Sequence, residues 1–501
     1  MQFINRLEFL KAIGAGILAM PRLAAAETKT ARPNIVYILA DDMGYGDLAC
    51  QNPKTKIPTP NLDRLASQGA RFTDAHTPSG VCTPTRYGVL TGRYCWRSAL
   101  KRGVLNGYSP RLIEPGRMTV ASLLRQNGYS TACLGKWHLG MDWQSKGEGS
   151  AGKKNGWQVD YTKPIQNGPN TVGFDYYFGI SASLDMPPFV FIENDRCQGV
   201  PTVEKTFVRK GPAAEDFEAV SVLPTLTRKA VAWINQQAAQ AKEGKPFFLY
   251  FPLNAPHAPI VPAPEFKSKS QAGDYGDFVN QVDWTVGEVL AALDGARLAD
   301  NTLVIFTSDN GPERFAYERV QEYRHYSMGD LRGVKRDTWE GGHRVPFLAR
   351  WPGKIQAGSI SNEIISHVDL MATAASLIGA SLPANAGEDS YNILPALLGQ
   401  KLEKPIREAT VYHSSKGDFA IRQGNWVFID SRSGEDSKEP DWFKQERGYK
   451  PHNFPGELFD LSQDISERGN LYGEHPERVR ELKALLQKYK DDGRSASLLK
   501  R

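Results

Sequence analysis

Beyond its first residues, the sequence has no long hydrophobic segment, which limits the kind of protein it can encode. After residue 26 no stretch approaches the roughly 20 consecutive apolar residues that a transmembrane helix needs, so we expect a soluble mature chain with no membrane span. Internal repeats and low-complexity tracts are also missing. Hydrophobic residues make up 41% of the 501 residues and charged residues 23%, which is typical of a folded globular protein and excludes a disordered chain.

A strong charge of either sign is missing as well. The formal net charge is +5, and residues 1–26 contribute about +2 of it. The basic residues are scattered along the chain and form no cluster. This pattern predicts no nucleic-acid binding.

Cysteine is scarce, with five residues in the whole chain. They are Cys50, Cys82, Cys95, Cys133 and Cys197. A chain of this length does not need disulfides to stabilise its core, and spacing alone does not decide any pairing. The odd number raises the question whether one cysteine serves a chemical purpose.

The N-terminal segment has the layout of a secretory signal. Arg6 and Lys11 precede the apolar run 12–20, and the alanines at 24–26 offer a cleavage site. We therefore predict a signal peptide over residues 1–26 and an exported protein, periplasmic or secreted. Residues 5–11 look like a twin-arginine signal without its second arginine, so the export route stays open. The alternative is an amphipathic helix that remains in the fold.

Continuous apolar, β-rich runs alternate with helical patterns through most of the chain. The runs at 34–40, 246–252 and 302–307 are expected to be strands buried on both faces. Helical patterns occupy residues 61–68, 119–127, 226–242, 277–293 and 365–378, the last with a helix that begins near Asp369. This alternation predicts an α/β domain over residues 27–400, with a large, mostly parallel sheet between helices.

The character of the sequence changes after about residue 400. The runs 419–423 and 426–429 flank Gly424-Asn425, which is a tight hairpin signal. Apolar residues at helical spacing between Val479 and Tyr489 mark a closing helix. Residues 401–501 are therefore predicted to form a smaller subdomain, an antiparallel sheet with a helix.

Polar residues follow two of the predicted strands. Asp41 and Asp42 come after the first strand, and Asp309 and Asn310 come after the strand at 302–307. Either pair alone is explained by helix capping or turn formation. Together, at the carboxyl ends of strands, they predict a divalent cation, and their oxygen ligands favour Ca²⁺ or Mg²⁺ over zinc.

Residues 82–86 read Cys-Thr-Pro-Thr-Arg. Pro84 fits the first turn of a helix, which would place Cys82 near backbone N–H groups that favour an anion. Arg86 would lie one turn further along. From the residues alone, Cys82 is either a reactive thiol of low pKa or a small buried apolar side chain.

This pentapeptide is accompanied by further segments in a particular order. They are 33–35 with 41–44 (DDMG), 59–63 (TPNLD), 135–140 (GKWHLG), 255–257 (APH), 308–311 (SDNG), Lys335 with 338–342 (TWEGG), and 457–461 (ELFDL). The set resembles the type I sulfatases of the alkaline-phosphatase superfamily, and most of all the arylsulfatase and N-acetylgalactosamine-6-sulfatase branch. Two positions depart from the common pattern: Thr85, where many members have serine, and Arg336-Asp337, where small residues are common.

The resemblance implies an alkaline-phosphatase-like fold and a cofactor set. Cys82 would be oxidised to formylglycine by a maturation enzyme. Ca²⁺, in preference to Mg²⁺, would be held by the side chains of Asp41, Asp42, Asp309 and Asn310, with an oxygen of residue 82 near the ion. One hydroxyl of the hydrated aldehyde would attack sulfur, and deprotonation of the second would expel sulfate.

The resemblance also implies roles for the remaining polar residues. Arg86, Lys136 and Lys335 would stabilise developing negative charge, Asp309 would draw a proton from the attacking hydroxyl, His138 would deprotonate the second hydroxyl, and His257 would protonate the leaving oxygen. Taken singly, these residues also fit ordinary loop or surface positions. If residues 136–138 are extended, Lys136 and His138 project to the same side.

A sulfated carbohydrate is the expected substrate. Trp143 and the segments 145–156 and 181–195 are the candidate sugar contacts, although loop packing explains their aromatic residues equally well. The closest alternative function is hydrolysis of phosphate esters or phosphonates by the same superfamily. A non-catalytic glycan-binding relative is the alternative from a different class.

Overall fold

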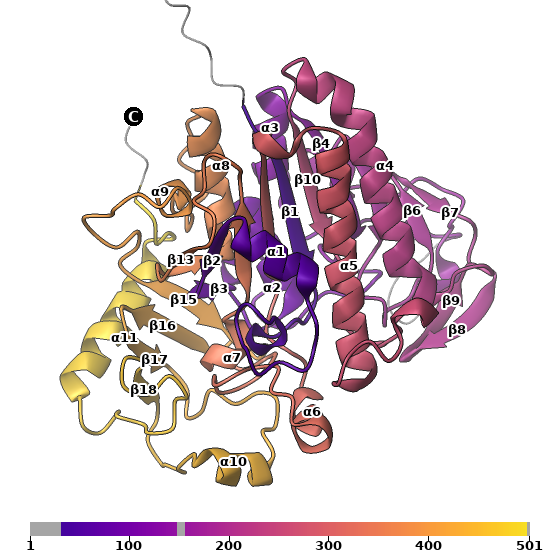
Figure 1. The fold of residues 1–501 in the computed structure, drawn as a ribbon. Helices are drawn as coiled ribbons and strands as arrows, with labels where there is room; N and C mark the ends of the chain where they lie inside the picture. The colour runs from indigo at the N-terminus through magenta and orange to yellow at the C-terminus, as the bar shows by residue number, and fades with distance from the viewer. Residues whose placement is uncertain (1–31, 148–155, 498–501) are drawn as a thin grey trace, which may run out of the picture. The chain divides into compact units, whose positions relative to one another are not determined.

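A ten-stranded sheet forms the centre of the computed structural model (Figure 1). In spatial order its strands are β13 (Ser359–Ser361), β2 (Ala70–Phe72), β12 (Phe347–Arg350), β11 (Thr302–Ser308), β1 (Asn34–Ala40), β10 (Phe247–Pro252), β4 (Ser130–Lys136), β5 (Tyr176–Ile180), β6 (Phe191–Glu193) and β7 (Arg196–Gln198). The structure describes residues 32–147 and 156–497. The predicted signal peptide and most of the 145–156 segment lie outside these residues.

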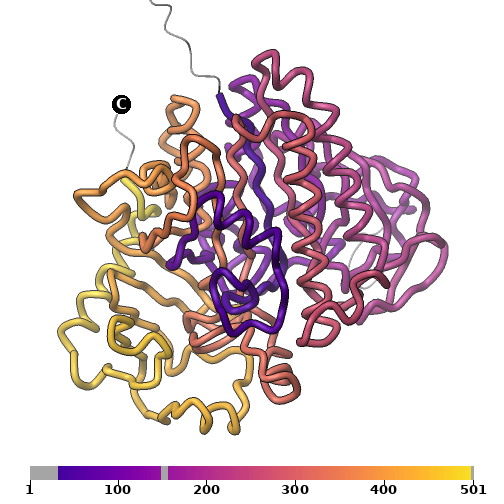
Figure 2. The backbone as a smooth tube through the Cα atoms, in the orientation of Figure 1, coloured from indigo at the N-terminus to yellow at the C-terminus, as the bar shows by residue number. Residues whose placement is uncertain are grey.

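The middle of the sheet is parallel. Strands β11, β1, β10, β4 and β5 run in the same direction, and β12 and β6 add antiparallel neighbours. Figure 2 shows the indigo strand β1 between strands that occur much later in the sequence, β10 and β11. Every residue of these three strands is buried. The predicted mixed, mostly parallel sheet is therefore confirmed.

Helices cover both faces of this sheet, which explains why its strands are apolar on both sides. Val36 and Ile38 of β1 pack into the core under helices α1 (Pro60–Ser67), α4 (Val222–Lys242) and α5 (Gly273–Gly295). Ile35 and Tyr37 point to the opposite core, under α2 (Cys82–Thr91), α3 (Val120–Gln126) and α8 (Leu370–Ile378). The helix predicted near Asp369 is α8, and Asp369 is its N-cap residue.

A second, four-stranded antiparallel sheet lies near the C-terminus, as predicted. It contains β15 (Thr410–His413), β16 (Phe419–Gln423), β17 (Trp426–Ile429) and β18 (Glu457–Asp460). The predicted hairpin joins β16 to β17, with Gly424 at φ +58°. Helix α11 (Pro476–Asp491) packs Leu482 and Leu486 against this sheet. The division at residue 400 stays a prediction.

Two further expectations concern membranes and disulfides. Among the helices of the described residues, none combines the length and the apolar character needed to cross a bilayer. All five cysteines are free thiols in this structure, with Cys82, Cys95 and Cys133 buried.

Candidate active site

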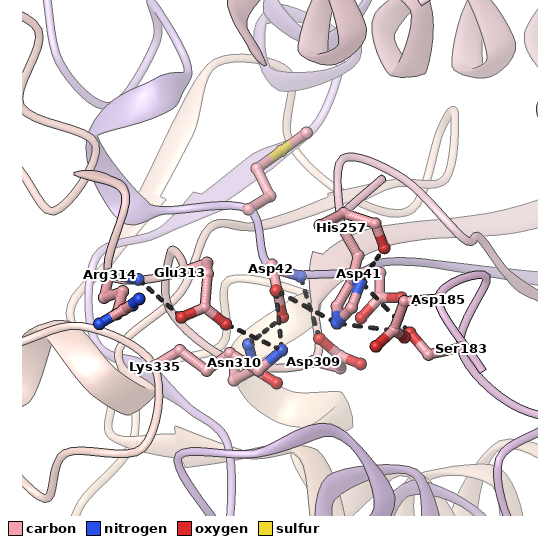
Figure 3. Close-up of polar contacts among 12 residues, drawn as sticks. Asp41, Asp42, Ser183, Asp185, His257, Asp309, Asn310, Glu313, Arg314 and Lys335 are labelled. Carbon is pink, nitrogen blue, oxygen red and sulfur yellow. Dashed lines mark hydrogen bonds and ion pairs between the residues drawn. The ribbon is translucent and has the colours of Figure 1, made fainter. Parts of the chain in front are cut away.

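The four predicted metal ligands meet at the carboxyl end of the main sheet. Strands β1 and β11 are parallel neighbours in register, with Ala40 opposite Ser308, so the residues that follow them lie side by side (Figure 3). The backbone N–H of Asp42 donates to Asp309 Oδ1 over 3.2 Å, and Asn310 Nδ2 donates to Asp42 Oδ1 over 2.7 Å.

Two buried oxygens of this group have no hydrogen-bond donor among the described residues. They are Asp41 Oδ1 and Asn310 Oδ1. A buried acceptor without a partner is costly, whereas a hard divalent cation prefers such oxygen ligands. The residues present therefore fit a Ca²⁺ or Mg²⁺ site. A nitrogen of His257 also lies within 4.8 Å of ligand oxygens of Asp41 and Asp42.

Three buried cations surround these carboxylates. Arg86 donates from Nε and Nη2 to Asp309 Oδ2 over 2.9 and 2.7 Å. Lys136 Nζ donates to Asp41 Oδ2 over 2.7 Å, and Lys335 Nζ donates to Asp42 Oδ2 over 2.8 Å. Since three cations balance three carboxylates, a bound divalent cation would make the site net positive and attractive to an anionic ester.

The carboxylates differ in how their surroundings shift their pKa. Burial alone would raise the pKa of Asp41, but Lys136, His257 and Arg86 outweigh it and hold this pKa well below its usual range. For Asp309, burial and the neighbouring charge of Asp41 raise the pKa to about 7, despite the contact with Arg86. Of Asp41 and Asp309, Asp41 is therefore the carboxylate that ionises more readily.

Cys82 is the first residue of helix α2, and Arg86 follows one turn later, as the spacing predicts. Burial raises the pKa of the Cys82 thiol, and the charges of Lys136 and Lys335 offset this only in part. The structure therefore disfavours a reactive thiol of low pKa. Arg86 Nη1 also donates to the carbonyl of Lys136 over 3.0 Å, which ties α2 to the end of β4.

His138 is buried and has a left-handed backbone, with φ +57°. Strand β4 ends at Lys136 and His138 is left-handed, so the condition under which Lys136 and His138 would project to the same side, an extended 136–138 segment, is not met. Nε2 of His138 donates to the carbonyl of Leu105 over 2.9 Å, which leaves Nδ1 as the unprotonated nitrogen. Nδ1 has no partner among the described residues. Burial and Lys136 lower the pKa of His138 well below its usual value, so the ring is neutral.

His257 lies close to Asp42, in the segment after β10. Its Nδ1 donates to the carbonyl of Ala258 over 2.6 Å, so Nε2 faces the site, 3.7 Å from Asp42 Oδ2. The structure thus brings His257 together with the other predicted site residues.

Comparison with known proteins decides the family. The model of the family described as Sulfatase matches residues 33–380. This chain belongs to the sulfatase family. It is a sulfuric ester hydrolase, as the sequence predicted, and hydrolyses sulfate esters.

Similar proteins cover nearly the whole of this sulfatase. An N-acetylgalactosamine-6-O-sulfatase of Bacteroides thetaiotaomicron is 36% identical over 92% of this chain and 93% of its own. Human arylsulfatase A is 34% identical over 92% of this chain and 87% of its own. A solved structure from a study of glycosaminoglycan metabolism by Bacteroides thetaiotaomicron aligns with a TM-score of 0.78 and 34% identity, covering 92% of this chain and 100% of that one. The predicted alkaline-phosphatase-like fold is confirmed.

The sulfatase site also contains residues that the sequence did not single out. Ser183 Oγ accepts from Lys136 Nζ over 3.2 Å and lies 3.3 Å from His257 Nε2. Asp185 lies beside it in Figure 3, with Oδ1 buried and without a donor among the described residues. Their segment was expected to contact a sugar, but nothing in the sequence distinguished these two positions within it.

Trp143, another expected sugar contact, packs within a local aromatic cluster. Its ring lies 6.3 Å from that of Tyr108 and 5.7 Å from that of Tyr161, and its Nε1 donates to the carbonyl of Gly107. These contacts favour a packing role for Trp143.

Proposed function

We propose that this sulfatase removes sulfate from a sulfated carbohydrate, using formylglycine at position 82 and a bound Ca²⁺ ion. The observation that carries the proposal is the pair of open oxygens on Asp41 and Asn310, surrounded by three buried cations beside the start of α2. The name of the Bacteroides relative and the subject of the similar solved structure support a carbohydrate substrate.

The cation would be held by side-chain oxygens of Asp41, Asp42, Asp309 and Asn310 and by an oxygen of residue 82. This all-oxygen set suits Ca²⁺, with Mg²⁺ as the less favoured ion, because Ca²⁺ tolerates irregular geometry. When bound, the ion supplies Lewis-acid polarisation of a sulfate oxygen.

Formylglycine would supply a nucleophilic hydroxyl for attack on sulfur and a second hydroxyl for expulsion of sulfate. Residue 82 is only 2% exposed, so a maturation enzyme would have to act before the chain closes around it. The side chain would then stand at the N-terminus of α2, where backbone N–H groups favour an anion.

The chain's own side chains account for the proton transfers. Asp309 draws a proton from the attacking hydroxyl, and the open Nδ1 of His138 can accept the proton of the second. His257, whose Nε2 faces the site, donates to the leaving oxygen. Arg86, Lys136 and Lys335 stabilise the charge that develops on the sulfate and the leaving oxygen.

Localisation and domain boundaries complete the proposal. Residues 1–26 would direct export to the periplasm or the outside, where polysaccharides are met. Residues 27–400 would form the catalytic domain and residues 401–501 the smaller subdomain.

The test is a parallel assay of sulfate and phosphate release from sulfated sugars, aryl sulfates and phosphate esters. Wild-type protein, with the aldehyde verified by mass spectrometry in the 72–86 peptide, is compared with Cys82→Ala. We expect sulfate release from a carbohydrate that the substitution abolishes. Phosphate release alone would favour the phosphoesterase alternative, and glycan binding without turnover would favour the non-catalytic one. Release that survives the substitution would refute the role of residue 82.

A further inference from the structure

Arg336 lies directly after the buried Lys335 and is itself partly open to solvent. Its side chain is 35% exposed, against 5% for Lys335. It is one of the two positions at which the sequence departs from the pattern it resembles.

The backbone of Arg336 is held by two hydrogen bonds, one of them to Gly80 in the turn that leads to residue 82. Its N–H donates to the carbonyl of Gly80 over 2.7 Å, and its carbonyl accepts from the N–H of Ser415 over 3.2 Å. A Cβ at Gly80 would lie 3.1 Å from the carbonyl carbon of Arg336, so glycine permits this close approach. Arg336 adopts φ +87°, in the left-handed region that non-glycine residues adopt uncommonly.

The guanidinium is oriented by one carboxylate. Nη1 and Nη2 of Arg336 donate to the two oxygens of Glu313 over 2.6 and 2.9 Å, and Glu313 Oε2 lies 3.7 Å from Lys335 Nζ. Although burial opposes ionisation, Lys335 and Arg336 hold the pKa of Glu313 far below its usual range. In Figure 3, Glu313 lies between Asp42 and the exposed Arg314. Glu313 therefore fixes the plane of the Arg336 guanidinium next to the site.

Three of the five N–H donors of Arg336 remain without an acceptor among the described residues. A planar guanidinium with free donors pairs well with a carboxylate or a sulfate group.

We propose that Arg336 binds a second anionic group of the substrate, a carboxylate or a further sulfate ester, beside the sulfate that is cleaved. Glu313 is the positioning residue that orients it. This inference rests on the proposed carbohydrate substrate. It assigns the enzyme to glycans in which the sulfated sugar is joined to another charged unit.

The test compares Arg336→Gln with wild type on three disaccharides that share one scissile sulfate. The neighbouring sugar is neutral, carries a carboxylate, or carries a second sulfate ester. We expect the ratio of kcat/KM for a doubly charged substrate to that for the neutral one to fall about tenfold or more, mainly through KM, because charge-assisted hydrogen bonds are lost. The arm with the larger loss identifies the group. Arg336→Lys should restore part of the ratio, and added salt should lower it in wild type.

A matched control is Arg324→Gln. Arg324 also has a positive φ, of 53°, and its side chain is 70% exposed and lies 3.6 Å from Glu446. Its substitution should leave the ratio unchanged. Equal losses on all three disaccharides, or an unchanged ratio in Arg336→Gln, would overturn the inference but leave the proposed function standing. Sulfate release from aryl sulfates and from no carbohydrate would overturn both.

Discussion

Among the described residues, this sulfatase has two groups of buried histidine and carboxylate side chains that lie close enough together to hold a metal ion, at different places in the fold and each with buried cations nearby. The first, here called the acidic site, comprises Asp41, Asp42, Asp309 and Asn310 with Arg86, Lys136, Lys335 and His257. The second, here called the junction cluster, lies where Arg422 of β16, in the C-terminal sheet, contacts β3 (Ala75–His76) and α7 (Glu340–His343). It comprises Asp74, His76, Glu340, His343, Arg344 and Arg422.

In both clusters, three titratable side chains lie close enough together to hold a metal ion. In the junction cluster they are His76, Glu340 and His343. There, however, Nη1 of Arg422 lies 3.0 Å from His76 Nε2 and 3.2 Å from Glu340 Oε2, so the chain's own cation already contacts two of the three side chains. Glu340 Oε1 also lacks a donor among the described residues, but a second cation there would be repelled.

The acidic site is arranged differently. Lys136 and Lys335 pair with Oδ2 of Asp41 and of Asp42, and Arg86 comes no closer than 3.6 Å to Asp41 Oδ1. Asp41 Oδ1 and Asn310 Oδ1, which follow β1 and β11, therefore have no hydrogen-bond donor among the described residues. Both clusters contain the same types of residue, so residue type does not distinguish them. They differ in where the cationic side chains lie: Arg422 contacts the candidate metal ligands of the junction cluster, whereas the cations of the acidic site leave two oxygens without a partner.

The largest effect expected from this comparison is on catalysis. Asp41→Asn should lower kcat/KM for sulfate release by about 10²–10³-fold, because it removes a proposed cation ligand and the partner of Lys136. The global stability should change far less than the activity. Steady-state kinetics and urea unfolding of the same preparation would measure both.

For Asp41→Asn, the matched substitution at the junction cluster is Arg422→Met. If both variants lost activity in proportion to stability, the proposed separation between a functional and a structural cluster would be wrong.

Substitution in the junction cluster should lower the stability of the protein and leave its catalysis largely unchanged. Arg422→Met leaves Asp74 and Glu340 buried without their main cation, so the free energy of unfolding should fall by about 3–5 kcal/mol. The folded fraction should keep its kcat within a few-fold. Lys483→Met is the control, because Lys483 is exposed and its pair with the half-buried Asp430, at 3.2 Å, should contribute no more than about 1 kcal/mol.

Removal of the divalent cation should also distinguish the two clusters, through a change in unfolding temperature that is smaller than the effects of the substitutions. A chelator should lower the unfolding temperature of wild type and of Arg422→Met, since an ion present at about 100 times its Kd stabilises the fold by about 2.7 kcal/mol. Asp41→Asn should show a much smaller shift. Differential scanning fluorimetry with and without Ca²⁺ measures it. An equal shift in all three proteins would place the ion elsewhere.

Much of the acidic site could be predicted from the sequence because its signals are local. Asp41-Asp42 and Asp309-Asn310 follow apolar strands directly, and the spacing of Cys82 and Arg86 is one helical turn. Once the sheet is parallel, these residues must meet at one edge.

The contacts that escaped prediction join distant segments. Glu313 touches Arg336 across 23 residues, Ser183 reaches His257 across 74, and Asp74 pairs with Arg422 across 348. Such pairs depend on how loops and the two sheets pack, which no local periodicity reveals. His138 is likewise held by distant segments, since its backbone N–H donates to the carbonyl of Ser181 and its ring contacts the carbonyl of Leu105.

The smallest predicted effect is on how the free energy of unfolding depends on pH in the acidic range. Burial lowers the pKa of His343 to about 3, and the charge of Glu340 opposes this only in part. An unfolded histidine titrates near 6.5, so between about pH 6.5 and pH 3 the unfolded chain binds one proton more than the folded one. The stability from the neutral ring is therefore full above pH 6.5 and is lost as the pH falls.

His343 alone should then contribute about 1.4 kcal/mol per pH unit to the decline of the free energy of unfolding. His343→Asn should flatten the decline between pH 6 and pH 4 by that amount. Buried His367 and His413, with pKa values lowered to about 3 and about 4, add decline of the same sign in every variant. Urea unfolding at several pH values gives the slopes. An unchanged slope in His343→Asn would mean that the pKa of His343 is not lowered in the folded protein.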